Sequence, residues 1–160
     1  MKILLINGSP KGKGSNSLKL AYSFLEGLKD GCARKGEDLS IEELHVASMK
    51  IGACKGCFAC WKKTPGICCI KDDMQAVIEK QLEADLILWS FPLYYFNVPG
   101  ILKNLIDRQL PMSLPFMSAR QNGCGSGSHD ARYDMEGKRH VLISTCGFYS
   151  ADENYDSVLR

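Results

Sequence analysis

The fold of this chain is decided near its start by Ile3-Leu4-Leu5-Ile6 and the loop that follows, Asn7-Gly-Ser-Pro-Lys-Gly-Lys-Gly-Ser-Asn-Ser17. The four apolar residues are consecutive, as in a parallel strand that is buried on both faces. After the loop, residues at helical spacing share one largely apolar face: Leu18, Ala21, Tyr22, Leu25 and Leu28. The pattern predicts a buried strand, a polar turn rich in glycine, and a helix.

Such a turn can bind a phosphate group. The first N–H groups of a helix have no partner within it, and the positive end of the helix dipole points the same way. Serine, asparagine and lysine side chains in the loop add hydrogen bonds and charge. The predicted phosphate ligands are Ser9, Lys11, Ser15, Asn16 and Ser17, with Lys13 as a second source of charge.

Two well-known phosphate loops do not match this sequence. A mononucleotide P-loop needs Ser or Thr after its lysine, whereas Lys13 is followed by Gly14. A dinucleotide loop needs a third glycine where this chain has Ser17. The remaining interpretation is a serine-lined loop for a terminal phosphomonoester such as that of FMN. The alternative is a glycine-rich connection that binds no ligand.

Length and composition limit the classes of function. The chain has 160 residues, 45% of them apolar, which is enough for one domain spanning residues 1–160. The net charge is +2 and no basic run stands out, which argues against a nucleic-acid partner. The most apolar segment, Leu86–Val98, is interrupted and too short to cross a bilayer. Because the first strand begins without a signal-peptide pattern, we expect a cytoplasmic protein whose eight cysteines are thiols or ligands.

Strand and helix patterns alternate along the chain. The predicted strands are Lys2–Asn7, Leu39–Val46, Asp85–Phe91 and Arg139–Thr145. One helix is expected to begin at Asp72 or Asp73, either of which suits an N-cap, and another near Pro99, with Arg108 in its last turn. This order predicts an α/β fold with an open parallel sheet and helices on both faces.

Two segments depart from this alternation. Residues 47–71 form a cysteine-rich insertion, and Gln109–Lys138 is a long, glycine-containing connection that we expect to be mobile. Residues Ala151–Arg160 have the pattern of a beginning helix. A fifth strand and its helix, usual in a doubly wound sheet, have no counterpart in the sequence, so we expect a C-terminally truncated domain.

Three loops are predicted to meet at the carboxyl edge of the sheet, where ligands bind in open parallel folds. The second of them, Phe91–Gly100, is aromatic and bounded by prolines, and the third is Ser144–Tyr149. Aromatic faces and backbone amides suit an isoalloxazine ring. The predicted ring contacts are Pro92, Leu93, Tyr94, Asn97, Thr145, Cys146, Gly147 and Phe148.

These three loops resemble those of the flavodoxin-like NAD(P)H-dependent FMN reductase family, which includes iron–sulfur flavoproteins. The resemblance rests on Gly8-Ser9-Pro10 through Ser17, on Pro92-Leu93-Tyr94 with Pro99, Gly100 and Lys103, and on Thr145-Cys146-Gly147-Phe148. It implies that FMN binds non-covalently and that NAD(P)H reduces it. A small-molecule acceptor would then take the electrons, and a partner subunit would complete the flavin site.

The cysteine-rich segment contains Cys54-x-x-Cys57-x-x-Cys60, followed by adjacent Cys68 and Cys69. Four closely spaced thiolates can bind a [4Fe–4S] cluster, and Cys68 is the preferred fourth ligand. A zinc site and free thiols remain open as alternatives. The spacing resembles the compact motif of iron–sulfur flavoproteins, and we expect the group to lie beside the flavin.

The sequence leaves three functional classes open. The first is an FMN-dependent NAD(P)H oxidoreductase, and the second is an electron carrier with FMN and a [4Fe–4S] cluster. The third is a redox- or metal-sensing cysteine module without enzyme activity. No catalytic side chain is predicted, because hydride transfer to a flavin needs no protein nucleophile.

Overall fold

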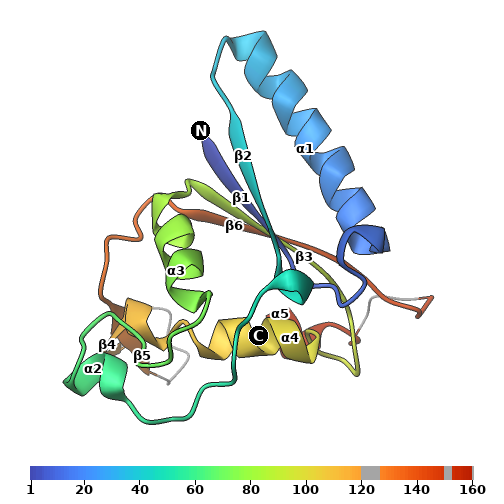
Figure 1. Ribbon diagram of the computed structural model, residues 1–160. Helices are drawn as coiled ribbons and strands as arrows, with labels where there is room; N and C mark the ends of the chain where they lie inside the picture. Colours follow the sequence, from blue (N-terminus) through green and yellow to red (C-terminus); the bar gives the residue numbers. More distant parts are fainter. Residues whose placement is uncertain (120–126, 150–152, 160) are drawn as a thin grey trace.

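The computed structural model describes residues 1–119, 127–149 and 153–159. Within these residues, four parallel strands form one sheet in the order β2–β1–β3–β6 (Figure 1). The strands are β1 Lys2–Asn7, β2 Ser40–His45, β3 Leu86–Pro92 and β6 Arg139–Thr145. The predicted open parallel sheet is confirmed, and each predicted strand end is correct to within one residue.

Helix α1, Asn16–Lys35, covers one face of the sheet. Its buried residues Leu18, Ala21 and Leu25 pack against Leu5 of β1 and Leu88 of β3. Leu18, Ala21 and Leu25 of the predicted apolar stripe are buried as expected, and Leu28 is partly buried. Tyr22 lies at the edge of the stripe, is 37% exposed, and its hydroxyl donates to Glu43 Oε2 at 2.9 Å.

Helices α3, Met74–Glu83, and α4, Gly100–Asp107, cover the opposite face (Figure 1). Val77, Ile78, Leu102 and Leu105 pack there against strand residues that include Ile87. Because β1 and β3 are buried on both sides, their apolar residues are consecutive, which explains the uninterrupted runs in the sequence.

The two aspartates that precede α3 bond differently from a simple N-cap. Asp73 occupies the cap position, but its carboxylate accepts from the backbone N–H of Lys50 at 2.7 Å. Asp72 accepts from the N–H of Met74 at 3.2 Å and also binds Arg108. Both acids therefore tie the start of α3 to segments outside the helix.

The segment predicted as a long connection contains regular structure. A short 3₁₀ helix, Leu110–Met112, leads into β4, Ser113–Ala119, which pairs antiparallel with β5, Gly127–Ala131. The sequences of β4 and β5 show little alternation of apolar and polar residues, and Pro115 in β4 is unfavourable for a strand. The sequence patterns therefore did not predict this pair of strands. Residues 120–126 of the connection that was predicted to be mobile lie outside the described residues.

The last described element is α5, Asp156–Leu159, within the range where a helix was expected to begin. Residues 151, 152 and 160 of that range lie outside the described part. Across the described residues, no helix combines the length and apolar character needed to cross a membrane.

Candidate flavin groove and cysteine centre

The predicted phosphate loop is held by Asn7 at the end of β1. The buried Asn7 side chain donates to the carbonyl of Gly12 at 2.8 Å and accepts from the N–H of Ser9 at 3.2 Å. A 3₁₀ turn, Gly12–Gly14, follows, and α1 begins after Ser15, whose hydroxyl accepts from the N–H of Leu18. The first N–H groups of α1 thus open at this loop, as the phosphate-site prediction requires.

Gly8 lets the loop pass close to α4. A Cβ built at Gly8 would lie 2.5 Å from Cδ2 of Leu102, which is buried in the core. Any side chain at this position would push the loop and α4 apart. The glycine therefore has a packing role in addition to its place in the predicted motif.

The aromatic loop after β3 contains a tight two-residue turn. Tyr94 and Asn97 exchange two backbone hydrogen bonds, of 2.8 and 3.0 Å, around Tyr95 and Phe96. Both central residues are left-handed, with φ of 48° and 62°. Turns of this type favour asparagine and glycine, so two aromatic residues there store backbone strain. Phe96 stacks on Phe148 of the loop after β6, with ring centroids 5.5 Å apart.

The three loops converge on one groove of about 200 Å³. Its lining combines the phosphate loop with both ring loops: Ser9, Lys11, Ser15, Asn16, Pro92, Leu93, Tyr94, Thr145, Cys146 and Gly147. The Leu93 N–H donates to the carbonyl of Thr145 at 2.8 Å and joins the second loop to the third. Ten of the thirteen predicted flavin contacts are thus brought together.

The other three predicted contacts face elsewhere. Ser17 is buried, and its hydroxyl hydrogen-bonds the Ser15 hydroxyl at 2.7 Å. Asn97 accepts from the N–H of Val98 at 2.8 Å and lines a different cavity. Phe148 lies against Phe96 at the aromatic turn and not in the groove lining.

The cysteine-rich segment brings its thiols together around a small pocket of about 20 Å³. All four predicted metal ligands line it, together with a fifth thiol: Cys54, Cys57, Cys60, Cys68 and Cys69. The sulfur atoms of Cys57 and Cys69 are 3.5 Å apart. Cys60 is the buried member. Among the described residues, no group of three potential ligands is already arranged to hold a single metal ion.

The thiols influence one another's ionisation. Burial raises the pKa of Cys60, and the neighbouring Cys68, Cys57 and Cys54 raise it further. Hydrogen bonds from the backbone of Ala59 and from the Cys69 thiol lower the pKa of Cys57. The ionisation of each of these thiols therefore depends on its neighbours.

Arg108 joins the cysteine pocket to the fold. It was predicted as an ordinary cation in the last turn of α4, but its side chain is 1% exposed and forms two 2.9 Å bonds with the Asp72 carboxylate. Nη1 also donates to the Gly52 carbonyl at 2.8 Å, and Nη2 to that of Ile70 at 3.4 Å. Burial lowers the pKa of Arg108, but interactions with Asp72 and Cys68 raise it above its ordinary value.

The cysteine pocket does not lie beside the flavin groove, contrary to expectation. The two sites share no lining residue. The groove loops precede α4, whereas Asp107 and Arg108, at the other end of this helix, line the cysteine pocket. Eight helical residues span about 12 Å. Figure 1 shows the chain after β2 running away from the sheet toward α2, Ala59–Lys62. The bonds of Arg108 to the carbonyls of Gly52 and Ile70 connect both ends of this segment to the end of α4.

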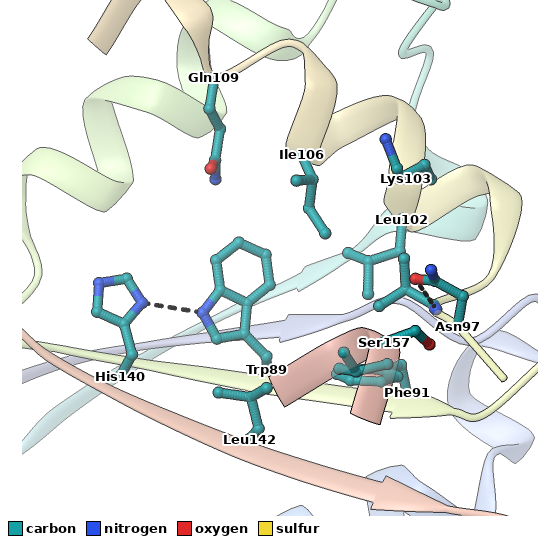
Figure 2. Close-up of a pocket in the computed structure, with 12 residues that line it drawn as sticks. Trp89, Phe91, Asn97, Leu102, Lys103, Ile106, Gln109, His140, Leu142 and Ser157 are labelled. Atoms are coloured by element: carbon teal, nitrogen blue, oxygen red, sulfur yellow. Dashed lines mark hydrogen bonds between the residues drawn. The ribbon is translucent and has the colours of Figure 1, made fainter. Parts of the chain in front are cut away.

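A larger cavity, of about 390 Å³, lies between α4 and the sheet (Figure 2). Trp89 and Phe91 of β3, Leu142 of β6 and Ile106 of α4 form much of its apolar wall. The Trp89 indole N–H donates to Nδ1 of His140 at 3.1 Å. Because its wall lacks the residues of the phosphate loop, this cavity is separate from the flavin groove.

The two other histidines also have structural contacts. His45 Nδ1 lies 3.1 Å from the Asn7 amide nitrogen. The His129 ring packs against Trp61, with centroids 4.8 Å apart and ring planes tilted by 54°. Neither lines the groove.

Comparison with known proteins assigns the family. The model of the Flavodoxin_2 family, described by its flavodoxin-like fold, matches residues 1–159. The chain belongs to this family. The predicted resemblance to the flavodoxin-like FMN reductase family is thus confirmed.

Relatives with two kinds of name match the chain. An iron–sulfur flavoprotein of Archaeoglobus fulgidus is 44% identical over 108 residues, which cover 68% of this chain and 48% of the relative. FMN-dependent NADH:quinone oxidoreductase 1 of Pseudomonas fluorescens is 28% identical over 155 residues, 91% of this chain and 68% of the relative. The chain spans about half the length of the iron–sulfur flavoproteins that it matches.

A solved structure supports the fold assignment. The crystal structure of an azoreductase from Bacillus anthracis aligns with 99% of this chain and 74% of its own, with a TM-score of 0.66 and 16% sequence identity. A likeness at this identity concerns the fold alone.

Proposed function

We propose that this chain is an electron-transfer flavoprotein domain of the iron–sulfur type, which binds FMN in the groove and a [4Fe–4S] cluster at the cysteine pocket. The observation that carries the proposal is the gathering of five cysteines around one pocket, closed by a buried arginine, in a chain that also forms the three-loop groove. The similarity to iron–sulfur flavoproteins supports it.

The groove fits FMN chemically. Ser9, Lys11, Ser15 and Asn16 would bind the phosphate at the start of α1, and Tyr94 with the loop 145–147 would face the ring. At about 200 Å³ the groove is smaller than most closed ligand pockets, which measure roughly 300–1,000 Å³, so part of the flavin would stay uncovered. Such an open face suits access by a nicotinamide, a small acceptor or a partner subunit. Bound FMN would supply the hydride and one-electron chemistry.

The cysteine pocket fits a cluster by its donor set. Cys54, Cys57, Cys60 and Cys68 are the proposed ligands. Cys68 interacts with the Arg108 guanidinium, whereas Cys69 contacts Cys57. At about 20 Å³ the pocket has little more than the volume of one water probe, so the thiols would have to separate around a cluster.

A second candidate is an NAD(P)H-dependent reductase of quinones or related small acceptors that uses FMN alone. The groove and the similarity to an FMN-dependent NADH:quinone oxidoreductase favour it. The cysteines would then be free thiols. Zinc binding and a sensing module without flavin are further outcomes that the same experiment separates.

The test is a visible spectrum with iron, sulfide and zinc analysis, on protein purified and reconstituted without oxygen. We expect flavin bands, a broad absorbance that reductant bleaches, and about four irons per chain. Flavin without iron, with oxidation of NAD(P)H, would establish the second candidate instead. The Cys57→Ser variant should lose iron and keep FMN. A colourless protein after incubation with FMN would exclude both flavin functions.

A further inference from the structure

The guanidinium of Arg108 has one N–H group that the fold does not use. A guanidinium carries five N–H donors in a fixed planar arrangement. Four are accounted for by Asp72, Gly52 and Ile70. The fifth, on Nε, is buried and has no hydrogen-bond partner among the described residues. A buried donor without a partner is energetically unfavourable, so such a group calls for an explanation, and a ligand that accepts its hydrogen bond is one.

The residue that carries this donor lines the cysteine pocket. Arg108 lines the pocket with Cys60 and Cys68, and its guanidinium interacts with the Cys68 thiol. Its four satisfied bonds lead to residues on both sides of the cysteine segment, Gly52 before it and Ile70 and Asp72 after it. The guanidinium thus holds both ends of the segment and also presents a buried positive charge to its thiols.

The other charged groups around the pocket are weaker candidates for this role. Lys55 is exposed, so water and salt screen its charge. Asp107 is negative and pairs with Lys103 in the preceding turn of α4. Asp72 offsets part of the Arg108 charge, but it bonds the terminal nitrogens Nη1 and Nη2 and not Nε.

We propose that Arg108 is a positioning and charge-compensating residue of the cysteine centre, which raises the reduction potential of the cluster held there. This inference rests on the proposed function. Four thiolates give the centre a net negative charge that grows on reduction, so a buried cation and a hydrogen bond to sulfur favour the reduced form.

The test uses a paired substitution, because removing Arg108 alone would leave the Asp72 carboxylate buried without its partner. The Arg108→Gln/Asp72→Asn variant replaces the ion pair with two amides that can still hydrogen-bond. After anaerobic reconstitution, iron content and the cluster midpoint potential are measured by a redox titration followed by electron paramagnetic resonance. We expect four irons per chain and a roughly tenfold lower ratio of reduced to oxidised cluster at a given potential, equal to about 59 mV for one electron.

Two further variants complete the test. Lys55→Gln removes an exposed charge from the same pocket and should shift the potential far less. Arg108→Lys retains the charge and should recover most of the wild-type potential. An unchanged potential in the paired variant with full iron content would overturn the inference. Arg108 would then only connect the two ends of the cysteine segment. Iron loss in the paired variant would also overturn the inference, because the expected result is a fully loaded cluster with a shifted potential.

The failure of this inference differs from the failure of the proposed function. If the wild-type protein binds no iron, the proposed function fails first. If the wild-type protein binds a cluster whose potential ignores Arg108, the proposed function stands and only the inference fails.

Discussion

Single side chains link the two candidate sites to the fold. Asn7 shapes the phosphate loop with two side-chain bonds, and Asp72 joins Arg108, Gly52 and the start of α3 through one carboxylate. Both are polar groups in buried surroundings, where each hydrogen bond matters more than at the surface. Substitutions of single side chains can therefore distinguish effects on ligand binding from effects on folding.

The phosphate assignment is best tested at Asn16. Asn16 lines the groove and is exposed, whereas Ser17 is buried and an acid there would damage the fold. Asn16→Asp should weaken FMN binding by about 1–3 kcal/mol, since a carboxylate would face the phosphate. It should not destabilise α1, because an acid in the first helical turn is favourable. Titration with FMN is the measurement, and Ser23→Asp, an equal charge change farther along α1, is the control. Equal FMN affinity in both variants would refute the assignment.

The Asp72 carboxylate should make stability depend on pH. Burial raises the pKa of Asp72, but the hydrogen bonds from Arg108, Gly52 and Met74 lower it by a larger amount. The pKa therefore lies below its ordinary value. The stabilisation is therefore complete above the unfolded-state pKa of about 4 and is lost as pH falls through the folded-state value.

Asp72→Asn should lower the free energy of unfolding by about 3–5 kcal/mol near neutral pH, because it leaves Arg108 buried without a charged partner. The difference from wild type should shrink in acid. Urea unfolding near pH 7 and near pH 3 measures both values. Asp107→Asn, which breaks only an exposed pair with Lys103, should cost less than about 1 kcal/mol. Equal losses in the two variants would contradict the role of Asp72.

Among the structural elements, the aromatic turn after β3 is strained where it borders the groove. Tyr95 and Phe96 both adopt left-handed conformations that asparagine and glycine adopt more easily. Strain of this kind persists where surrounding contacts hold it in place, and it is frequent at binding sites. The stack of Phe96 on Phe148 is one such contact.

Relief of this strain should stabilise the protein. Tyr95 is 97% exposed, so Tyr95→Asn removes little packing while it favours the left-handed conformation. We expect the free energy of unfolding to rise by about 1 kcal/mol, measured by urea unfolding. Tyr149→Asn replaces another exposed tyrosine that lacks a left-handed backbone and should change stability by less than about 0.5 kcal/mol. A destabilised Tyr95→Asn protein would show that the tyrosine ring itself supports the turn.

In the molecule as a whole, the sheet ends at β6 on one side. Within the described residues, β6 pairs only with β3, and Leu142 on this strand is 45% exposed beside the apolar cavity of Figure 2. An unpaired strand edge next to apolar surface favours association with another chain. We therefore propose this strand edge as the contact surface of the predicted homo-oligomer.

We expect the 160-residue chain to self-associate in a concentration-dependent manner, measured by sedimentation velocity. Leu142→Lys should shift the distribution toward monomer, because a lysine on an edge strand opposes pairing. Leu20→Lys introduces the same change at an exposed leucine of α1 and should leave association unchanged. A monodisperse wild-type monomer would contradict this expectation.

The sequence by itself determined what depends on neighbours along the chain. The strand, glycine-rich turn and helix at residues 2–35 follow from local periodicity, and the parallel order of the strands places three loops at one edge. Because the loops after parallel strands meet at one edge of the sheet, the sequence was sufficient to select the ten residues that line the groove. It missed the outward orientation of Asn97 and Phe148, because rotation within a loop depends on contacts that are not local.

Only the tertiary structure decided the environment of Arg108 and the place of the cysteines. Arg108 and Asp72 are 36 residues apart, and their pairing depends on where the end of α4 lies relative to the start of α3. In the sequence, Arg108 looks like a cation at a helix end, where it would be exposed to solvent. In the folded chain it is buried, and it bonds the cysteine segment at the end of α4 that lies away from the groove. Cysteine spacing predicts that thiols can converge, but their location is set by packing between distant segments, which spacing does not encode.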